Sequence, residues 1–220
     1  MPEWLLPTGR YLVTGFGTTL LIASLSVVLA TPLGIAIGIM TQNSHRLASL
    51  LARGYIETLR GVPSLMTLLF VFFALPRLGI ETGPITASVI GLGFWSAANI
   101  GEGVRGALSS IPTGQIIAAR ALGMTQIQTI LLVIFPQALR RFLPPYVGQM
   151  TILIQASTLT SVVGVTDLLG SARQMIERLT YVSDSSHAVL IYGFVMALFF
   201  VVCYPLTVMG KILEDKVRSS

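Results

Sequence analysis

The chain has 220 residues, of which 53% are hydrophobic and only 10% are charged, and its mean hydropathy is +0.80. Soluble domains carry about a quarter charged residues, so this composition excludes a water-soluble domain and indicates a membrane protein. The length leaves no room for an independent catalytic module once spans of about 20 residues each are subtracted. We therefore expect an all-α membrane protein with a single domain over residues 1–220.

Windows without charged residues predict the spans in chain order, because a charge at the bilayer centre costs at least a few kcal/mol. The uncharged window that begins after Arg60 is shorter than a bilayer requires, so the second helix is expected to begin before that residue. The segment 121–139 is also uncharged, but it carries several Thr and Gln residues, and we interpret it as interfacial. The prediction is five spans, at about 12–40, 57–76, 83–104, 141–164 and 187–210, with a loop over 105–140.

The 14 lysine and arginine residues divide unequally between the two sides that five spans define. Four lie on one side: Arg10, Arg77, Arg173 and Arg178. Ten lie on the other: Arg46, Arg53, Arg60, Arg105, Arg120, Arg140, Arg141, Lys211, Lys216 and Arg218. Short cytoplasmic loops hold an excess of positive residues, so the second side is predicted to be cytoplasmic, with the N-terminus outside and the C-terminus inside. The net charge of +5 then reflects topology, and we expect no nucleic-acid binding.

Motifs for catalysis, metal binding or nucleotide binding are missing from the sequence. His45 and His187 belong to different ends of the predicted topology and cannot share a metal ion. A single cysteine, Cys203, permits no intramolecular disulfide, and no phosphate-loop motif occurs. We expect no enzyme, no metal site and no cofactor. The N-terminal segment lacks the basic leader of a cleavable signal peptide, so the first span is expected to be retained.

The predicted cytoplasmic segment 105–140 carries the strongest functional signal. A short helix is predicted over 116–122, and its small residues Ala118, Ala119 and Ala121 would allow it to lie closely in the groove of another protein. Gly123 permits a turn with positive φ at the end of this helix. The pattern indicates a docking element. The alternative is an ordinary amphipathic interfacial helix that links two spans.

This segment resembles the loop motif of ABC importer permeases, which reads Glu-Ala-Ala, three residues, Gly, nine residues, Ile, one residue, Leu-Pro. The matching residues here are Ala118-Ala119, Gly123, Val133, Phe135 and Pro136. The longer string AARALGMTQIQT…PQALRRFLPP is similar to the polar amino-acid importer subfamily, which includes histidine, glutamine and glutamate/aspartate permease subunits. The segments GFGTTL, LRGVPSLMTLLF, EGVRGALSSIPTGQ and STLTSVVGVTDLL agree in the same order, so the resemblance covers nearly the whole chain.

The resemblance implies the type I ABC importer permease fold, with five transmembrane helices and a cytoplasmic coupling-helix loop, in a bacterial inner membrane. Two permease subunits, identical or different, would form the pathway through the lipid bilayer. Two ABC ATPase subunits would dock beneath them, and an extracytoplasmic solute-binding protein would deliver a polar amino acid. The residues implied to couple the chain to the ATPase are Ala118, Ala119, Ala121, Gly123 and Pro136.

Two positions depart from the family pattern. Ile117 stands where the loop motif has its glutamate, so the polar contact of that residue cannot be transferred to this chain. Gln155-Ala156 stands where relatives often have Lys or Gln followed by Asp, which changes the polarity near the implied pathway. Docking by shape is compatible with the first departure, whereas the second weakens any inference of the substrate from the family.

Polar residues inside the predicted spans are the candidates for the pathway, because they are costly in a membrane unless they face a cavity or a partner. They are Ser96, Asn99, Glu102, Gln149, Gln155, Ser157 and Thr158. Glu102 could instead simply pair with Arg105, three residues later. Gly34 and Gly38 form a small-xxx-small pair that predicts close helix packing.

Two other functions are compatible with a membrane protein of this size. A self-contained channel or secondary carrier would need titratable residues deep in the spans or internal repeats, and the sequence shows neither. A membrane scaffold that binds a partner without transport is the third hypothesis. The matched segments favour the importer over both.

Overall fold

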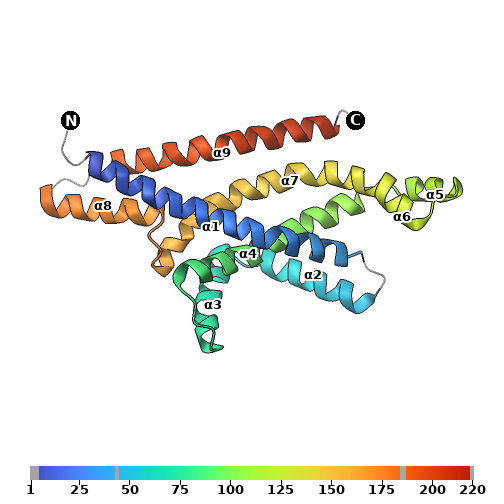
Figure 1. The fold of residues 1–220 in the computed structure, drawn as a ribbon, viewed down its shortest axis with the longest axis horizontal. Coiled ribbons are helices and arrows are strands. Elements are labelled where there is room, and N and C mark those ends of the chain that lie inside the picture. Colours follow the sequence, from blue (N-terminus) through green and yellow to red (C-terminus); the bar gives the residue numbers. More distant parts are fainter. Residues whose placement is uncertain (1–4, 43–44, 184–186, 219–220) are drawn as a thin grey trace.

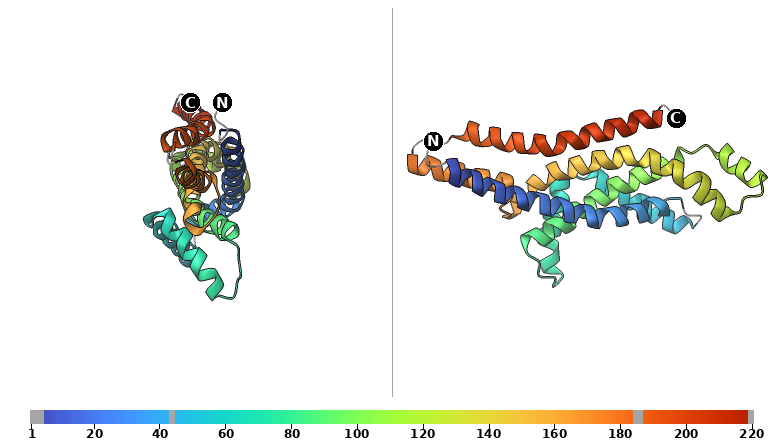
Figure 2. Two further views of the ribbon diagram at one scale, coloured as in Figure 1. Left: turned by 90° about the vertical axis from the view of Figure 1, so that its left-hand side faces the viewer. Right: turned by 45° about the horizontal axis from the view of Figure 1, so that its top comes forward.

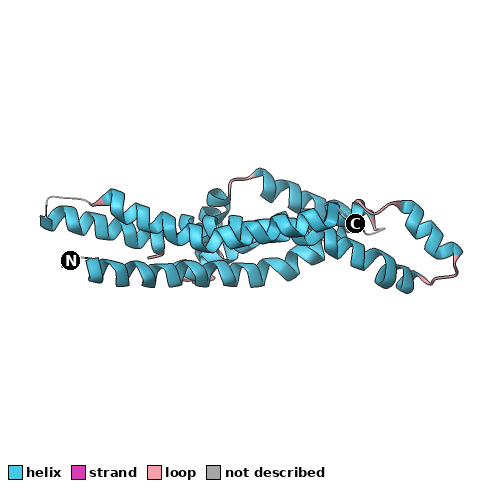
Figure 3. Ribbon diagram, turned by 90° about the horizontal axis from the view of Figure 1, so that it is seen from above, coloured by secondary structure: helices cyan, strands magenta, loops and turns pink. Residues whose placement is uncertain are grey.

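The computed structural model describes residues 5–42, 45–183 and 187–218, and these are helical almost throughout, with no strand among them (Figure 3). Two helices are each long and apolar enough to cross a membrane, over Thr8–Met40 and Ala188–Val217. Two bent helix pairs raise this number to at most four within the described residues. The predicted third span corresponds to a helix that is not among these four, α4 (Pro84–Ser109), which carries Glu102 and Arg105.

The most extensive contact between two helices joins α1 (Leu5–Met40) to α4, and glycines allow the two backbones to approach closely. A Cβ at Gly34 would lie 2.7 Å from the carbonyl oxygen of Ala97, and one at Gly38 would lie 2.7 Å from that of Gly101. Neither position can therefore hold a larger residue without movement of the α4 backbone. The predicted packing role of the small-xxx-small pair is confirmed.

The segment predicted as one helix over 57–76 is in fact two helices, so this part of the prediction is wrong. They are α2 (Arg46–Gly61) and α3 (Ser64–Arg77), and they are bent by 107°. Pro63 disfavours helical backbone at the residue before it, and Val62 is extended with φ −102° and ψ 136°. As a result α3 packs on α4 near its start, through Leu68, while its end projects away from the other helices (Figures 1 and 2).

Helices occupy most of the segment that was predicted as a loop over 105–140. The helix α4 continues to Ser109, and two short helices follow, α5 (Thr113–Ala121) and α6 (Gln126–Gln128). Thr125 and Gln128 cap α6 reciprocally. A π-helix, η1 (Thr129–Ile134), then runs directly into α7 (Phe135–Ala156), so the fourth long helix begins earlier than the predicted 141.

Beyond α7 the predicted fourth span continues as a tighter helix. A 3-10 helix, η2 (Ser157–Val163), ends at Gly164, whose φ of +85° suits a residue without a Cβ. The next helix, α8 (Leu168–Ser183), was not predicted and packs on α1 and on α9 (Ala188–Arg218) through a buried apolar cluster. The cluster includes Leu12, Leu168, Ala172 and Ile191.

The helices α1, α4, α7 and α9 run roughly along one long axis, with the start of α1 near one end of it and the end of α9 toward the other (Figure 1). A second apolar cluster joins α1, α3, α4 and α7 near the middle through Ile22, Leu68, Leu92 and Leu153. The helix α9 packs on α7 at the edge of the bundle, and only 17% of its most apolar stretch is buried. The short helices α5 and α6 form one tip of the molecule.

Candidate functional site

A cavity of about 220 Å³ lies where α2, α4 and α7 meet, and polar side chains line much of it. Three of the predicted pathway residues contribute to its wall, namely Asn99 and Glu102 of α4 and Gln149 of α7. The Nε2 atom of Gln149 donates a hydrogen bond to Oγ of the fully buried Ser96, at 3.2 Å. Four of the seven predicted residues are therefore gathered in one place, although they come from two helices far apart in the sequence.

Glu102 is held by two arginines at the edge of this cavity. Arg105 donates to both carboxylate oxygens, at 2.8 Å from Nε and 2.6 Å from Nη2, so the pair that the sequence suggested is present. Arg60, at the end of α2, approaches the same carboxylate from another helix, with 3.5 Å between Nη1 and Oε1. The contact within α4 is thus tight and the contact between helices is looser.

A second cavity, of about 270 Å³, lies next to the first on the side of α2. Its wall carries three arginines and two glutamates: Arg53, Glu57, Arg60, Glu102 and Arg105. Arg60 and Glu102 line both cavities, so their ion pair forms part of the wall between the two spaces. Arg60 was not predicted as a site residue, because its contact with α4 depends on how α2 folds back along the bundle.

The other three predicted pathway residues do not line either cavity. Gln155 is exposed near the end of α7. The hydroxyl of Ser157 donates to the carbonyl of Ile154 at 2.7 Å, and that of Thr158 donates to the carbonyl of Gln155 at 2.8 Å. These hydroxyls are satisfied by the turn that starts η2, which is the usual local use of Ser and Thr in helices.

The predicted coupling residues lie at the tip formed by residues 113–136, which we call the coupling tip. Gly123 has φ +80°, as the sequence predicted, and the N–H of Met124 donates to the carbonyl of Ala119 at 3.1 Å. Ala119 is buried, whereas Ala118 and Ala121 are exposed. The tip exposes a set of large apolar side chains: Ile117, Leu122, Ile127, Leu131, Leu132 and Phe135.

Contacts tie the coupling tip to the long helices. The Nε2 atom of Gln137 donates to Oε1 of Gln115 at 2.5 Å, which links α7 to α5. Arg141 of α7 donates through Nη1 to the carbonyl oxygen of Ser110 and, at 2.8 Å, to its hydroxyl. Pro136 is exposed at the point where the π-helix η1 passes into α7. The tip and α7 are therefore mechanically continuous.

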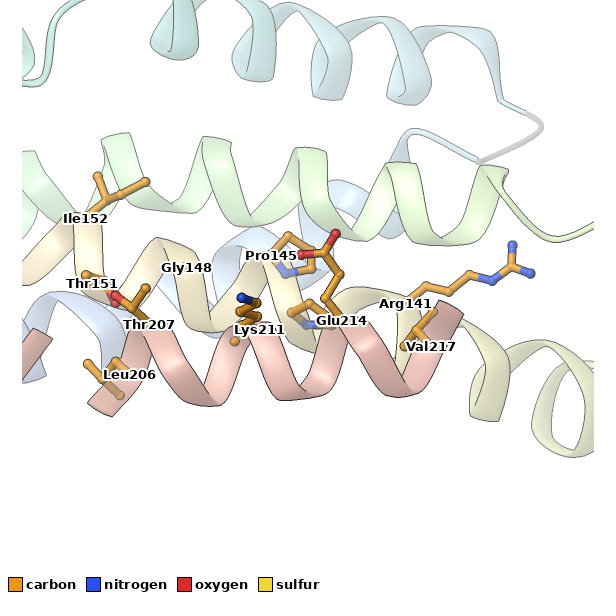
Figure 4. A pocket seen from close by; sticks show the side chains of 12 residues that line it. Arg141, Pro145, Gly148, Thr151, Ile152, Leu206, Thr207, Lys211, Glu214 and Val217 are labelled. Carbon is orange, nitrogen blue, oxygen red and sulfur yellow. The ribbon is translucent and has the colours of Figure 1, made fainter. Parts of the chain in front are cut away.

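A third hollow, of about 740 Å³, lies along the contact between α7 and α9 and is lined by both helices (Figure 4). We call it the α7–α9 groove. No predicted site residue lines it, and its wall is mainly apolar.

Residues 30–219 match the family described as "Binding-protein-dependent transport system inner membrane component". The chain belongs to this family. A probable glutamine ABC transporter permease protein of Bacillus subtilis (strain 168) is 33% identical over 93% of this chain and 92% of its own. The glutamine transport system permease protein of Escherichia coli (strain K12) is 31% identical over 96% of this chain and 95% of its own length.

Solved structures agree with this assignment. The "Crystal structure of an amino acid ABC transporter with histidines" matches with a TM-score of 0.84 and 28% identity, over 96% of both chains. An inward-facing methionine ABC transporter shares the fold at a TM-score of 0.69 and 22% identity, over 99% of both chains. The predicted type I importer fold is confirmed.

Family membership decides between the functions that the sequence left open. The permease is a membrane component of a binding-protein-dependent transport system in the inner membrane, so it is a transport subunit and not an enzyme. The family also implies an ATPase partner and a second permease subunit. A self-contained channel or carrier is thereby excluded.

Proposed function

We propose that this permease moves a polar amino acid that an extracytoplasmic binding protein releases, through a pathway shared with a second permease. The cavity between α2, α4 and α7 is the observation that carries the proposal. It combines the amides of Asn99 and Gln149 with the carboxylate of Glu102 and the guanidinium of Arg60. An amino acid carries one ammonium and one carboxylate, and this wall offers a partner of each sign together with neutral donors and acceptors.

Names of related proteins support the same substrate class. The relatives include permeases named for glutamine, for arginine and for nopaline, which all carry an α-amino acid group. In the proposed pathway Ser96 orients the amide of Gln149, and Asn99 and Glu102 contact the passing solute. A later part of the proposed pathway would be lined by the end of α7 and the start of η2, with Gln155, Ser157 and Thr158.

We also propose the following topology. The five spans are α1, the bent pair α2–α3, α4, α7 with η2, and α9, with the N-terminus outside and the C-terminus in the cytoplasm. This arrangement places the coupling tip on the cytoplasmic side together with ten of the 14 lysine and arginine residues. It places α8 on the outer surface, where the binding protein would approach.

The ATPase would dock on the coupling tip, with Ala118, Ala119, Ala121, Gly123 and Pro136 as the coupling residues. The tip supplies exposed apolar side chains for such a contact, and Ile117 is 68% exposed at the position of the family glutamate. Because η1 and α7 are continuous and Gln137 and Arg141 brace them, a displacement of the tip would move α7 and hence Gln149. A rigid-body movement of this kind can switch a pathway between two arrangements.

The substitution Gly123→Asp tests this proposal. An L-residue at φ +80° strains the turn that ends α5, so the docking surface should lose its shape while the bundle remains intact. We expect binding-protein-stimulated ATP hydrolysis and amino-acid uptake to fall together at least tenfold in proteoliposomes. The matched control is Gly114→Asp, which adds the same charge to the same tip where a Cβ meets nothing within 4 Å and φ is not positive. Full stimulated hydrolysis and uptake in Gly123→Asp would contradict the docking role.

A further inference from the structure

The cavity between α2, α4 and α7 has two amides in its wall whose nitrogen atoms are already engaged. Nδ2 of Asn99 donates a hydrogen bond to the carbonyl oxygen of Trp95 at 3.0 Å, and a carbonyl can only accept, so the orientation of this amide is fixed. Nε2 of Gln149 donates to Oγ of Ser96 in the same way. Neither amide oxygen has a hydrogen-bond partner among the described residues. Both oxygens are therefore available as acceptors on side chains that line the cavity.

Tyr146 of α7 lines the same cavity, and its hydroxyl hydrogen is directed at α1. The hydroxyl lies 2.9 Å from Oγ1 of Thr31, and that Oγ1 also donates to the carbonyl oxygen of Val27 at 2.8 Å. A threonine hydroxyl has one hydrogen. Because that hydrogen is used on Val27, the tyrosine is the donor in its contact with Thr31. The only N–H or O–H donor of the Tyr146 side chain is thus not available to a solute.

The ring of Tyr146 is held in place as well as its hydroxyl. It packs against Phe142 with 5.2 Å between the ring centroids, and Phe142 belongs to a buried apolar cluster that joins α1, α4 and α7. Both aromatic residues line the cavity. The face of an aromatic ring is electron-rich and attracts a cation that lies within about 6 Å of its centroid. The α7 side of the cavity therefore offers an aromatic wall that favours positive charge.

The charged groups of the cavity complete its chemistry. Arg60 is the cation of the wall and Glu102 is its anion, but Arg105 already donates to both oxygens of Glu102. A carboxylate of a solute is therefore suited to Arg60. A group rich in N–H donors is suited to the two amide oxygens and to the aromatic wall. A primary ammonium is such a group, because it is positively charged and has three N–H donors and no acceptor.

We propose that this cavity holds the α-ammonium of the transported solute between the amide oxygens of Asn99 and Gln149 and the ring of Tyr146, while Arg60 binds the carboxylate. Thr31 is then a positioning residue, which keeps the hydroxyl hydrogen of Tyr146 away from the ammonium. The inference rests on the proposed function and narrows it to solutes with a primary α-amino group. Betaines keep the positive charge but lack N–H donors, and α-hydroxy acids lack the charge, so the cavity should reject both classes.

Binding to the assembled importer, prepared without the binding protein, tests the substrate class. Saturation-transfer NMR titrations with L-glutamine, L-glutamate and L-arginine identify the amino acid that binds most tightly. Its Nα-trimethyl derivative and its α-hydroxy analogue should each bind at least about tenfold more weakly, because the acceptors of the wall are then left unpaired. Equal binding of the amino acid and either analogue would overturn the inference and leave the proposed function standing. Absence of binding by all three amino acids would overturn the proposed function, and the inference with it.

Substitutions on α1 and α7 test the positioning role. Thr31→Val keeps the shape of the side chain but releases the hydroxyl hydrogen of Tyr146, so the amino acid should bind about fivefold more weakly. The α-hydroxy analogue should lose little, so that the discrimination between the two shrinks. Tyr146→Phe removes the released hydrogen, and the double variant should therefore bind the amino acid as well as Tyr146→Phe alone does.

Thr14→Val is the matched control on α1. Thr14 is exposed and its hydroxyl donates to the carbonyl oxygen of Arg10, so its loss should change binding less than twofold. Unchanged discrimination between the amino acid and its α-hydroxy analogue in Thr31→Val would overturn the positioning role. A double variant that binds as weakly as Thr31→Val would overturn it too, because the defect would then not depend on the tyrosine hydroxyl.

Discussion

Asp167 is completely buried at the start of α8, in the turn outside the proposed spans. Its Oδ1 accepts a hydrogen bond from the N–H of Gly170 at 2.7 Å, which caps the helix. Its Oδ2 and the neighbouring Oγ of Ser171 have no hydrogen-bond partner among the described residues. Burial raises the pKa of the Asp167 carboxyl to about 6, because desolvation disfavours the charged form more than the cap favours it.

This carboxyl should make the stability of the permease depend on pH. The folded pKa of about 6 exceeds the ordinary value of 3.8, so the folded state binds the proton more tightly than the unfolded state does. The free energy of unfolding therefore falls as pH rises from about 4 to about 6, and the loss is complete above that range. Asp167→Asn keeps the acceptor for Gly170 and removes the charge, so it should stabilise the protein at pH 7.5 by about 3 kcal/mol.

Unfolding in detergent, followed at pH 4 and pH 7.5, checks this expectation. The gain of Asp167→Asn should be present at pH 7.5 and absent at pH 4. Asp215→Asn is the matched control, since it makes the same substitution at an exposed position of α9 and should leave the stability close to that of the wild type. A stability difference for Asp167→Asn that does not change between the two pH values would show that the buried charge is not its source.

At the scale of helices, the contact between α1 and α4 depends on the absence of side chains at two glycines. A Cβ at Gly34 would lie 2.7 Å from both the Ala97 oxygen and the Cβ of Ile100, so backbone as well as side chains would have to move. Gly34→Ala should destabilise the permease by about 1–3 kcal/mol, the usual cost of overpacking. Gly17→Ala in the same helix is the control, because its Cβ meets nothing within 4 Å. Unfolding by detergent titration should separate the two variants, and equal stability would contradict the packing role.

Helix positions were predictable from the sequence where a local cause acts. The charge-free windows coincide with parts of the helices α1, α4 and α9, because apolar residues without charges are found where a long helix is buried or lipid-facing. The break at Val62 and Pro63 has a local signal too, but it was outweighed by the length that a straight span requires. The helix α8 also had a local signal, because its buried residues Leu168, Ala172, Met175 and Leu179 recur at helical spacing, but a search for uncharged windows does not detect that periodicity.

The candidate site was predictable only in part, for a related reason. Polar residues on one helix, such as Asn99 and Glu102, could be found because their spacing places them near each other. Arg60 could not, since it reaches Glu102 only after α2 folds back against α4. Gln149 and Gln155, six residues apart, were expected to face different directions, but the sequence did not say which one faces the bundle; in the structure Gln149 is buried against Ser96 and Gln155 is exposed.

At the scale of the whole molecule, the ion pair between Arg60 and Glu102 connects α2 to α4 where two cavities adjoin. Both residues line the cavity that holds Asn99 and Gln149 and also the charged cavity beside α2, so in the proposed pathway a solute that passes from one to the other would meet the pair. The pair is loose, at 3.5 Å, and the Arg60 side chain is 44% exposed. Exposed pairs contribute at most about 1 kcal/mol, which is small enough to be broken and remade in every transport cycle. Arg60 is also next to the bend between α2 and α3, where a hinge movement would change its position.

Arg60→Gln should therefore make the proposed pathway leak. Loss of the ion pair lowers the free energy that favours the closed wall by about 1 kcal/mol. Passive flux should therefore rise by up to about fivefold. The measurement is uptake of radiolabelled polar amino acids by proteoliposomes that contain the assembled importer, without ATP and without binding protein. Arg53→Gln removes the same charge from the wall of the second cavity alone, and its flux should remain at the wild-type level. Glu102 keeps its contacts with Arg105 in both variants, so the comparison isolates the link between helices. A passive flux of Arg60→Gln equal to that of Arg53→Gln would show that solute does not pass between these two cavities.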